Sequence, residues 1–174
     1  MSAEVEGSAT LPAEAHLSER LVGEAAIAGG LGAVAIMLWF LILDTIQGHP
    51  LYTPSVLGTV LFHSGGEAVS LPNLSVSLGM VLLYTILHGV GFCFVGYVAV
   101  RLFVAAERHP AWLFGLLLFF IFFFAGFLAF NLITDLPVFE AISVPAVLGG
   151  NFLAAFFMGR YLWRRHPLDL RQLL

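Results

Sequence analysis

The sequence predicts an all-α membrane protein with four transmembrane helices, because of its composition, its apolar runs and the placement of its arginines. Hydrophobic residues make up 60% of the 174 residues and charged residues only 10%. About a quarter of an ordinary soluble domain is charged. Too few polar side chains are present to cover a surface in water, so we expect lipid to surround this chain.

Four apolar runs, at residues 21–43, 78–100, 112–133 and 145–163, are each long enough to cross a membrane. A hydrocarbon core about 30 Å thick takes roughly 20 helical residues. Together the runs form a predicted transmembrane domain at residues 18–166, followed by a short cytoplasmic tail at 167–174. Residues 1–17 are acidic and rich in small side chains, so we expect them to be disordered.

The arginines predict the orientation of these spans. All seven basic residues are arginines, and they lie before the first run, between the second and third, or at and after the end of the fourth. The two remaining loops contain none, and basic loops stay in the cytoplasm. Both termini are therefore predicted to be cytoplasmic. So few positive charges, spread along the chain, also argue against nucleic-acid binding.

A short helix is predicted at residues 54–63, in the first outer loop. Thr53-Pro54 is typical of a helix start, with a cap residue followed by proline at the first position. Ten residues reach only about 15 Å, so this helix either lies in the outer interface or enters the bilayer as a re-entrant half-helix. Its apolar residues fall on one stripe, which favours the interfacial interpretation: Val56, Leu57, Val60 and Leu61.

Small residues predict where the helices pack. In lipid, association depends on close backbone contact and a few polar bonds rather than on burial of apolar area. Small residues recur at four-residue spacing in the first, second and fourth runs, and hence on one face of each helix. The expected packing positions are Gly30, Gly89, Gly150, Ala154 and Gly159. The Phe-rich third run is expected to pack at the edge.

Two polar residues lie near the middle of predicted spans, His88 in the second and Asn151 in the fourth. Such side chains are costly at membrane depth and are therefore functional candidates. Adjacent glycines, Gly89 and Gly150, predict a close approach and a hydrogen bond between the two. The pair would fix the bundle, relay protons or bind a ligand. His88 could instead bind a tetrapyrrole, although one chain offers no second histidine at that depth.

A cluster of polar residues is predicted on the outer face: Asp44, His49, His63, Glu67, Asn131, Asp135 and Glu140. Carboxylates and imidazoles can bind a divalent metal, but the spacing fits no metal motif, so we interpret them as solvated loop residues. Asp44 and Asp135 end helices and could bond the backbone of the neighbouring loop instead. No motif of a soluble-type enzyme occurs, and no cofactor or catalytic residue is predicted.

Three segments carry a resemblance: WFLILD at 39–44, HPLYTPSVLG at 49–58 and AVLGGNFLAAFFMGRYLWRRHP at 146–167. In these segments the chain resembles a group of small bacterial four-helix membrane proteins without a known function. The resemblance implies a four-helix fold in the bacterial inner membrane. Our leading hypothesis is a non-enzymatic accessory subunit or homo-oligomer that acts through lipid-embedded helix contacts. The alternatives are a small transporter or channel component that uses His88 and Asn151, and a redox-cofactor or pigment-binding subunit.

Overall fold

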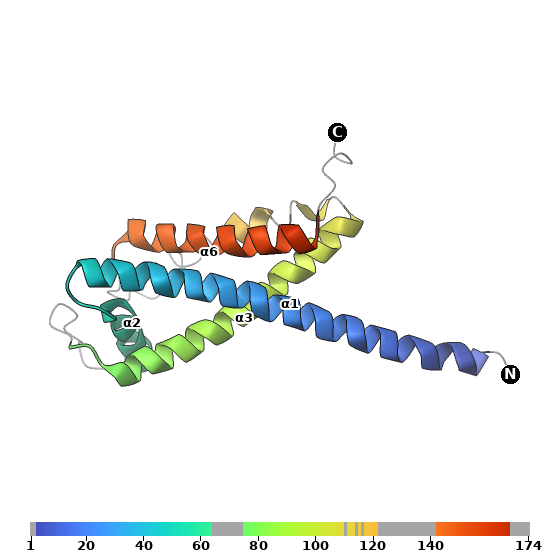
Figure 1. Ribbon diagram of the computed structural model, residues 1–174, viewed down its shortest axis with the longest axis horizontal. Coiled ribbons are helices and arrows are strands. Elements are labelled where there is room, and N and C mark those ends of the chain that lie inside the picture. The colour runs from blue at the N-terminus through green and yellow to red at the C-terminus, as the bar shows by residue number, and fades with distance from the viewer. Residues whose placement is uncertain are drawn as a thin grey trace.

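The computed structural model describes residues 3–63, 75–109, 111–113, 115, 117–121 and 142–167, with side chains from Ser18 onward. All regular structure in these segments is helical and no strand occurs among them, as the sequence predicts. The helices with complete bounds are α1 (Ala3–Ile46), α2 (Tyr52–His63), α3 (Leu78–Arg108) and α6 (Val144–Arg165) (Figure 1).

Helices α3 and α6 match the predicted second and fourth runs at their start and extend beyond them at their end. Helix α3 begins at Leu78 and continues to Arg108, and α6 begins at Val144 and ends at Arg165. Arginines occupy the last turn of both helices, where a positive charge interacts favourably with the helix dipole. The helices therefore continue past the last apolar residue instead of ending with the apolar run.

Helix α1 is 44 residues long and begins at Ala3. The structure differs here from the prediction of a disordered segment over residues 1–17. Alanine, glutamate and leucine are frequent in this segment, and they are among the residues with the highest helix propensity. At 1.5 Å per residue the helix measures about 66 Å, roughly twice the thickness of a hydrocarbon core.

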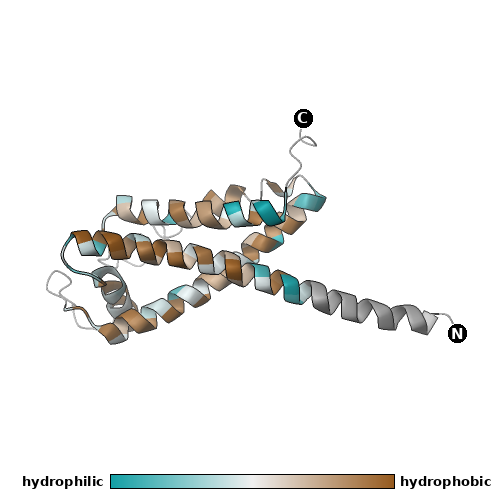
Figure 2. Cartoon of the chain, in the orientation of Figure 1, coloured by the Kyte–Doolittle hydropathy of each residue, from teal (hydrophilic) through white to brown (hydrophobic). Residues whose placement is uncertain are grey.

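Two helical segments, Ser18–Ile46 and Leu78–Arg108, are long and apolar enough to cross a membrane. Both segments carry mainly hydrophobic residues (Figure 2). Their most apolar windows have mean hydropathies of 2.4 and 2.0, and only 22% and 6% of these windows are buried. Helix α6, with 22 residues, is long enough to cross a membrane. It is less apolar than these two segments, because it contains Gly150, Asn151 and Arg160. The predicted third span, residues 112–133, lies largely outside the described residues.

Helices α1 and α3 cross where glycines let their backbones touch (Figure 1). A Cβ on Gly96 would lie 2.7 Å from the backbone nitrogen of Gly29, and a Cβ on Gly29 would lie 2.7 Å from the carbonyl carbon of Phe92. The predicted contact positions Gly30 and Gly89 are not at this crossing, since no described atom lies within 4 Å of a Cβ there. Small residues occupy several faces of α1, so their spacing alone does not select the face.

Helix α6 packs along α1. A Cβ on Gly150 would lie 3.1 Å from Cδ1 of Trp39, and the Trp39 indole N–H donates to the carbonyl oxygen of Ala146 over 2.8 Å. Ala154 is fully buried. Two of the predicted packing positions, Gly150 and Ala154, therefore lie at contacts within the described part of the fold. At Gly159, the third predicted packing position on α6, a Cβ would have only a loose contact, 3.9 Å from Phe120.

Helix α2 fills the wedge between the end of α1 and the start of α3 (Figure 1). Ser55 and Val56 are both fully buried. The Ser77 backbone N–H donates to Ser55 Oγ over 2.9 Å, and Gly58 allows the backbone of Met80 to approach. Protein covers Val56 and Val60 of the predicted apolar stripe and also Ser55 and Thr59 on the hydroxyl side of α2, whereas Leu61 is 39% exposed. The hydroxyl side therefore faces protein and not water, which the prediction of an amphipathic interfacial helix did not include.

Candidate functional site

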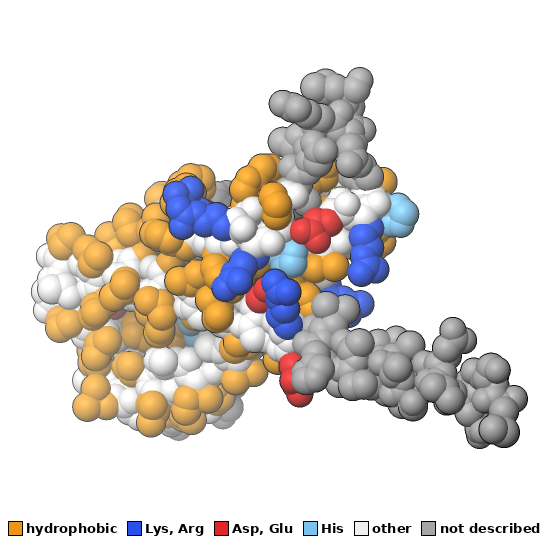
Figure 3. Space-filling model, turned by 45° about the vertical axis from the view of Figure 1, so that its right-hand side comes forward, with side chains coloured by type: hydrophobic (Ala, Val, Ile, Leu, Met, Phe, Trp, Pro, Cys, Tyr) orange, Lys and Arg blue, Asp and Glu red, His pale blue; other side chains and the backbone are white. Residues whose placement is uncertain are grey.

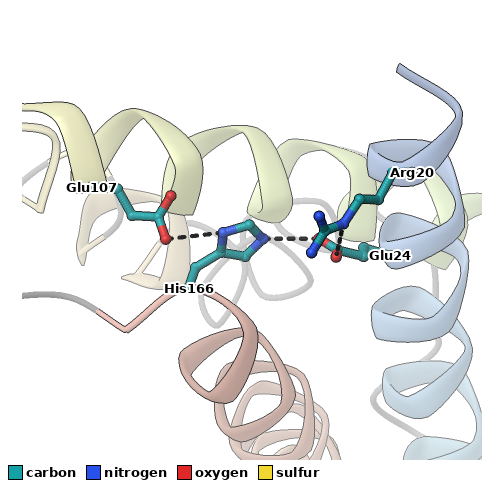
Figure 4. A network of polar contacts seen from close by, with 4 residues as sticks. All are labelled: Arg20, Glu24, Glu107 and His166. Atoms are coloured by element: carbon teal, nitrogen blue, oxygen red, sulfur yellow. Dashed lines mark hydrogen bonds and ion pairs between the residues drawn. The ribbon is translucent and has the colours of Figure 1, made fainter. Parts of the chain in front are cut away.

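A network of charged side chains joins α1, α3 and the end of α6 (Figure 4). Arg20 Nε donates to Glu24 Oε1 over 3.3 Å, and both residues lie on α1. Nε2 of His166, the residue that follows α6, lies 2.9 Å from the other carboxylate oxygen of Glu24. The second ring nitrogen of His166, Nδ1, lies 3.1 Å from Glu107 Oε1 on α3. One histidine therefore links three helices.

Each ring nitrogen of His166 faces a carboxylate oxygen, from Glu24 on one side and from Glu107 on the other. The side chains of Glu24 and His166 are 7% and 12% exposed, so this pair is shielded from water and interacts more strongly than a surface pair. The network holds together what we call the basic end of the molecule, defined by Arg20, Arg108 and Arg165.

A cavity of about 710 Å³ lies beside the network. Arginines from three helices line it: Arg20, Arg101, Arg108 and Arg165. His109 and Trp112 line it as well, together with the two glutamates and the histidine of the network. Figure 3 shows the basic side chains gathered around acidic and histidine side chains, whereas the remainder of the described surface in that view is mainly apolar. Positive charge is thus in excess around this cavity.

His88 lies at a separate site, on the part of α3 that faces α1 and α2. Its ring centroid is 5.5 Å from that of Tyr84 and 4.7 Å from that of Phe92. The imidazole lines a cavity of about 220 Å³, which is apolar except for Thr53, Tyr84, Thr85 and His88 itself. His88 Nε2 is buried and has no hydrogen-bond partner among the described residues.

Asn151 does not pair with His88 in the described part of the chain. No hydrogen bond joins the two side chains there, and Asn151 does not line the cavity that His88 lines. Helices α3 and α6 each pack against α1 and have little contact with one another. Similar depth in two spans was therefore not sufficient to bring these residues together.

Asp44 binds the start of α2. The Thr53 backbone N–H donates to Asp44 Oδ2 over 2.8 Å, and the Thr53 hydroxyl donates to Oδ1 over 2.7 Å. Asp44 and Thr53 are 4% and 5% exposed, so neither bond competes with water. Asp44 thus satisfies a free N–H in the first turn of α2, where an anion is also favoured by the helix dipole. Thr53 serves as a donor to Asp44 and not as the cap that the Thr53-Pro54 motif predicted.

The other residues of the predicted outer cluster form no site in the described structure. His49 is exposed in the turn after α1, and His63 is the last residue of α2. No group of three metal-binding side chains occurs among the described residues. The remaining members lie outside the described residues: Glu67, Asn131, Asp135 and Glu140.

Sequence reasoning missed the network around His166. Glu24 and His166, which are in direct contact, are 142 residues apart in the sequence, and no periodic pattern relates them. We interpreted the segment that contains His166 only as a topological signal. A usable signal was present, because Glu24, Glu107 and His166 all lie near the ends of apolar runs on the same predicted side of the membrane.

No family model matches the chain, and searches of curated proteins and of solved structures find no match. The function of the protein is therefore inferred from its own residues and their geometry.

Proposed function

We propose that this protein spans the bacterial inner membrane four times, with both termini in the cytoplasm, and acts without catalysis through helix contacts within the lipid. Helices α1, α3 and α6 and the segment 112–133 supply the spans. The observation that carries the proposal is the exposure of the apolar segments Ser18–Ile46 and Leu78–Arg108, of whose apolar windows 22% and 6% are buried. Lipid stabilises a continuous apolar surface of this kind, whereas water does not.

The distribution of charge supports the proposed orientation. Four arginines from separate parts of the chain line one cavity at the basic end. Asp44 and α2 lie at the opposite end of α1, where the described residues include no arginine. Arginine-rich ends remain on the cytoplasmic side of a membrane.

Reporter fusions test this topology. A reporter enzyme that is active only in the periplasm is expected to work when fused after Ser70, and to be inactive when fused after Glu107 or Leu174. The reason is that arginines keep the loop between the second and third predicted spans, and the C-terminal end of the chain, on the cytoplasmic side. Activity after Glu107 together with inactivity after Ser70 would contradict the orientation.

An exposed face of α3 supports contact with a second copy of the chain. Leu82, Ile86 and Val90 are 61%, 56% and 64% exposed on this face. No described atom lies within 4 Å of a Cβ on Gly89, which lies among them, and the neighbouring Cys93 is exposed. A glycine on an apolar surface lets another helix approach closely, as helix pairs in membranes require. Self-association through this face is the form of helix contact that we propose.

The substitution Gly89→Leu is expected to shift the wild-type oligomer to monomer without lowering its thermal stability. A leucine there would block close approach by a second helix, but it would meet no described atom of its own chain. Native mass in detergent measures the shift, and oxidative cross-linking through Cys93 gives a second readout. Gly23→Leu is the matched control, because Gly23 is similarly open but lies on α1 near the basic end. An unchanged oligomer in Gly89→Leu would refute self-association through this face.

A transport function has less support in the described structure. The transport hypothesis was based on a polar pair, His88 and Asn151, at the middle of the membrane. Asn151 does not line the cavity that His88 lines. No acidic or arginine side chain lines that cavity. A conducting path for ions or polar solutes requires polar groups along its length.

A further inference from the structure

The cavity at the basic end contains guanidinium groups that no described carboxylate neutralises. Arg101 and Arg108 form no ion pair within the described residues, and the Arg165 guanidinium lies 5.8 Å from the centroid of the Tyr161 ring. Both glutamates of the cavity already bind within the network, to His166 or Arg20. Donors on α3 and at the end of α6 thus remain available to a ligand.

The chemistry of the lining favours a phosphate group. A guanidinium presents several N–H donors in a plane and matches the oxygens of phosphate, often with two parallel hydrogen bonds. Four arginines face two glutamates around this cavity, so positive charge is in excess even when both histidines are neutral. Its volume of about 710 Å³ is within the range of ligand-binding pockets, about 300–1,000 Å³.

The position of the cavity favours a lipid as the source of that phosphate. It lies at the end of two apolar helices, where headgroups are located in the proposed topology, and Trp112 is part of its lining. Tryptophan is enriched at the headgroup level, and basic pockets between membrane helices on the cytoplasmic side bind anionic headgroups. We infer that this cavity binds the phosphate of one anionic phospholipid, with Arg101 and Arg108 as its principal ligands. The inference rests on the proposed membrane topology but not on self-association.

A matched pair of double variants tests the inference. Arg101→Gln/Arg108→Gln removes two charges from the cavity. Arg160→Gln/Arg164→Gln removes the same charge from α6, where both arginines line a different and mainly apolar groove. A third variant, Arg101→Lys/Arg108→Lys, keeps the charge and removes the planar donors. All four of these arginines are exposed, so the variants are expected to fold.

Native mass spectrometry of the full chain in detergent, titrated with phosphatidylglycerol or phosphatidylcholine, measures the binding. Wild type and the Arg160/Arg164 variant are expected to retain one phosphatidylglycerol per chain in preference to phosphatidylcholine. The Arg101/Arg108 glutamine variant is expected to bind it roughly 25-fold more weakly, because each arginine near anionic lipid contributes about fivefold. The lysine variant should fall between wild type and the glutamine variant.

Three results would overturn the inference. Equal weakening in the two glutamine variants would show that the lipid follows surface charge and not the cavity. Equal retention of both lipids would show that the headgroup is not recognised. Binding of inorganic phosphate that displaces phosphatidylglycerol from a wild-type chain would assign the cavity to free phosphate. The reporter fusions test the topology separately, so loss of lipid binding in a correctly oriented protein would concern the cavity alone.

Discussion

The substitution Gly96→Ala is expected to separate α1 from α3 and to lower the free energy of unfolding by about 3 kcal/mol, at the upper end of the usual cost of overpacking. The new Cβ would lie 2.7 Å from the backbone nitrogen of Gly29. Backbone atoms of a helix cannot rotate aside as a side chain can, so the two helices would have to move apart. Thermal unfolding in detergent, followed by circular dichroism, measures the loss.

Gly30→Ala and Gly91→Ala are the controls for this prediction. No described atom lies within 4 Å of a Cβ at either position. Alanine is favoured over glycine in a helix by about 1 kcal/mol, so these variants should be as stable as wild type or slightly more stable. Similar unfolding temperatures for Gly96→Ala and the two controls would show that the helices do not touch at Gly96.

The second large effect is expected from Asp44→Ala, which should lower the free energy of unfolding by about 3 kcal/mol, because it leaves two buried donors of Thr53 without an acceptor. The unpaired groups are the Thr53 N–H and hydroxyl, now 2.8 and 2.7 Å from the carboxylate oxygens. Thermal unfolding in detergent measures the loss, and limited proteolysis of the turn between α1 and α2 detects local opening.

Substitutions at Thr53 provide the graded controls. Thr53→Ser retains both donors and should remain close to wild type in stability. Thr53→Ala retains only the N–H bond and should lose about 1 kcal/mol, the usual contribution of one hydrogen bond. If Asp44→Ala were no less stable than Thr53→Ser, the carboxylate would not be holding the start of α2.

The local parts of this fold could be predicted from the sequence because they depend on neighbouring residues. Helix α3 begins at Leu78, where its apolar run begins. Asp44 bonds a residue only nine positions away, and a helix-ending aspartate was expected to bond the adjacent loop. The start of α1 at Ala3 was missed because an acidic segment rich in small residues was interpreted as disordered, although alanine and glutamate have high helix propensity.

The long-range parts could not be predicted because the same pattern fits several arrangements. Gly29 and Gly30 are adjacent, and either could have faced α3; the structure selects Gly29. His88 and Asn151 have similar positions along their spans, but their helices pack on α1 and not on one another. The contact between Glu24 and His166 depends on where the end of α6 lies relative to α1. The residues around His166 do not by themselves determine that position.

Helices α1 and α3 touch at Gly29 and Gly96 and diverge on both sides of this contact (Figure 1). The space between them on one side faces α2, and the space on the other side faces the arginine-lined cavity. A change in the angle between the two helices would therefore widen or narrow both spaces together. Helix α2 occupies the first space, anchored by Asp44 and Ser77. We therefore expect a substitution that changes the size of a buried side chain in α2 to alter the angle between α1 and α3 and, with it, the width of the arginine-lined cavity.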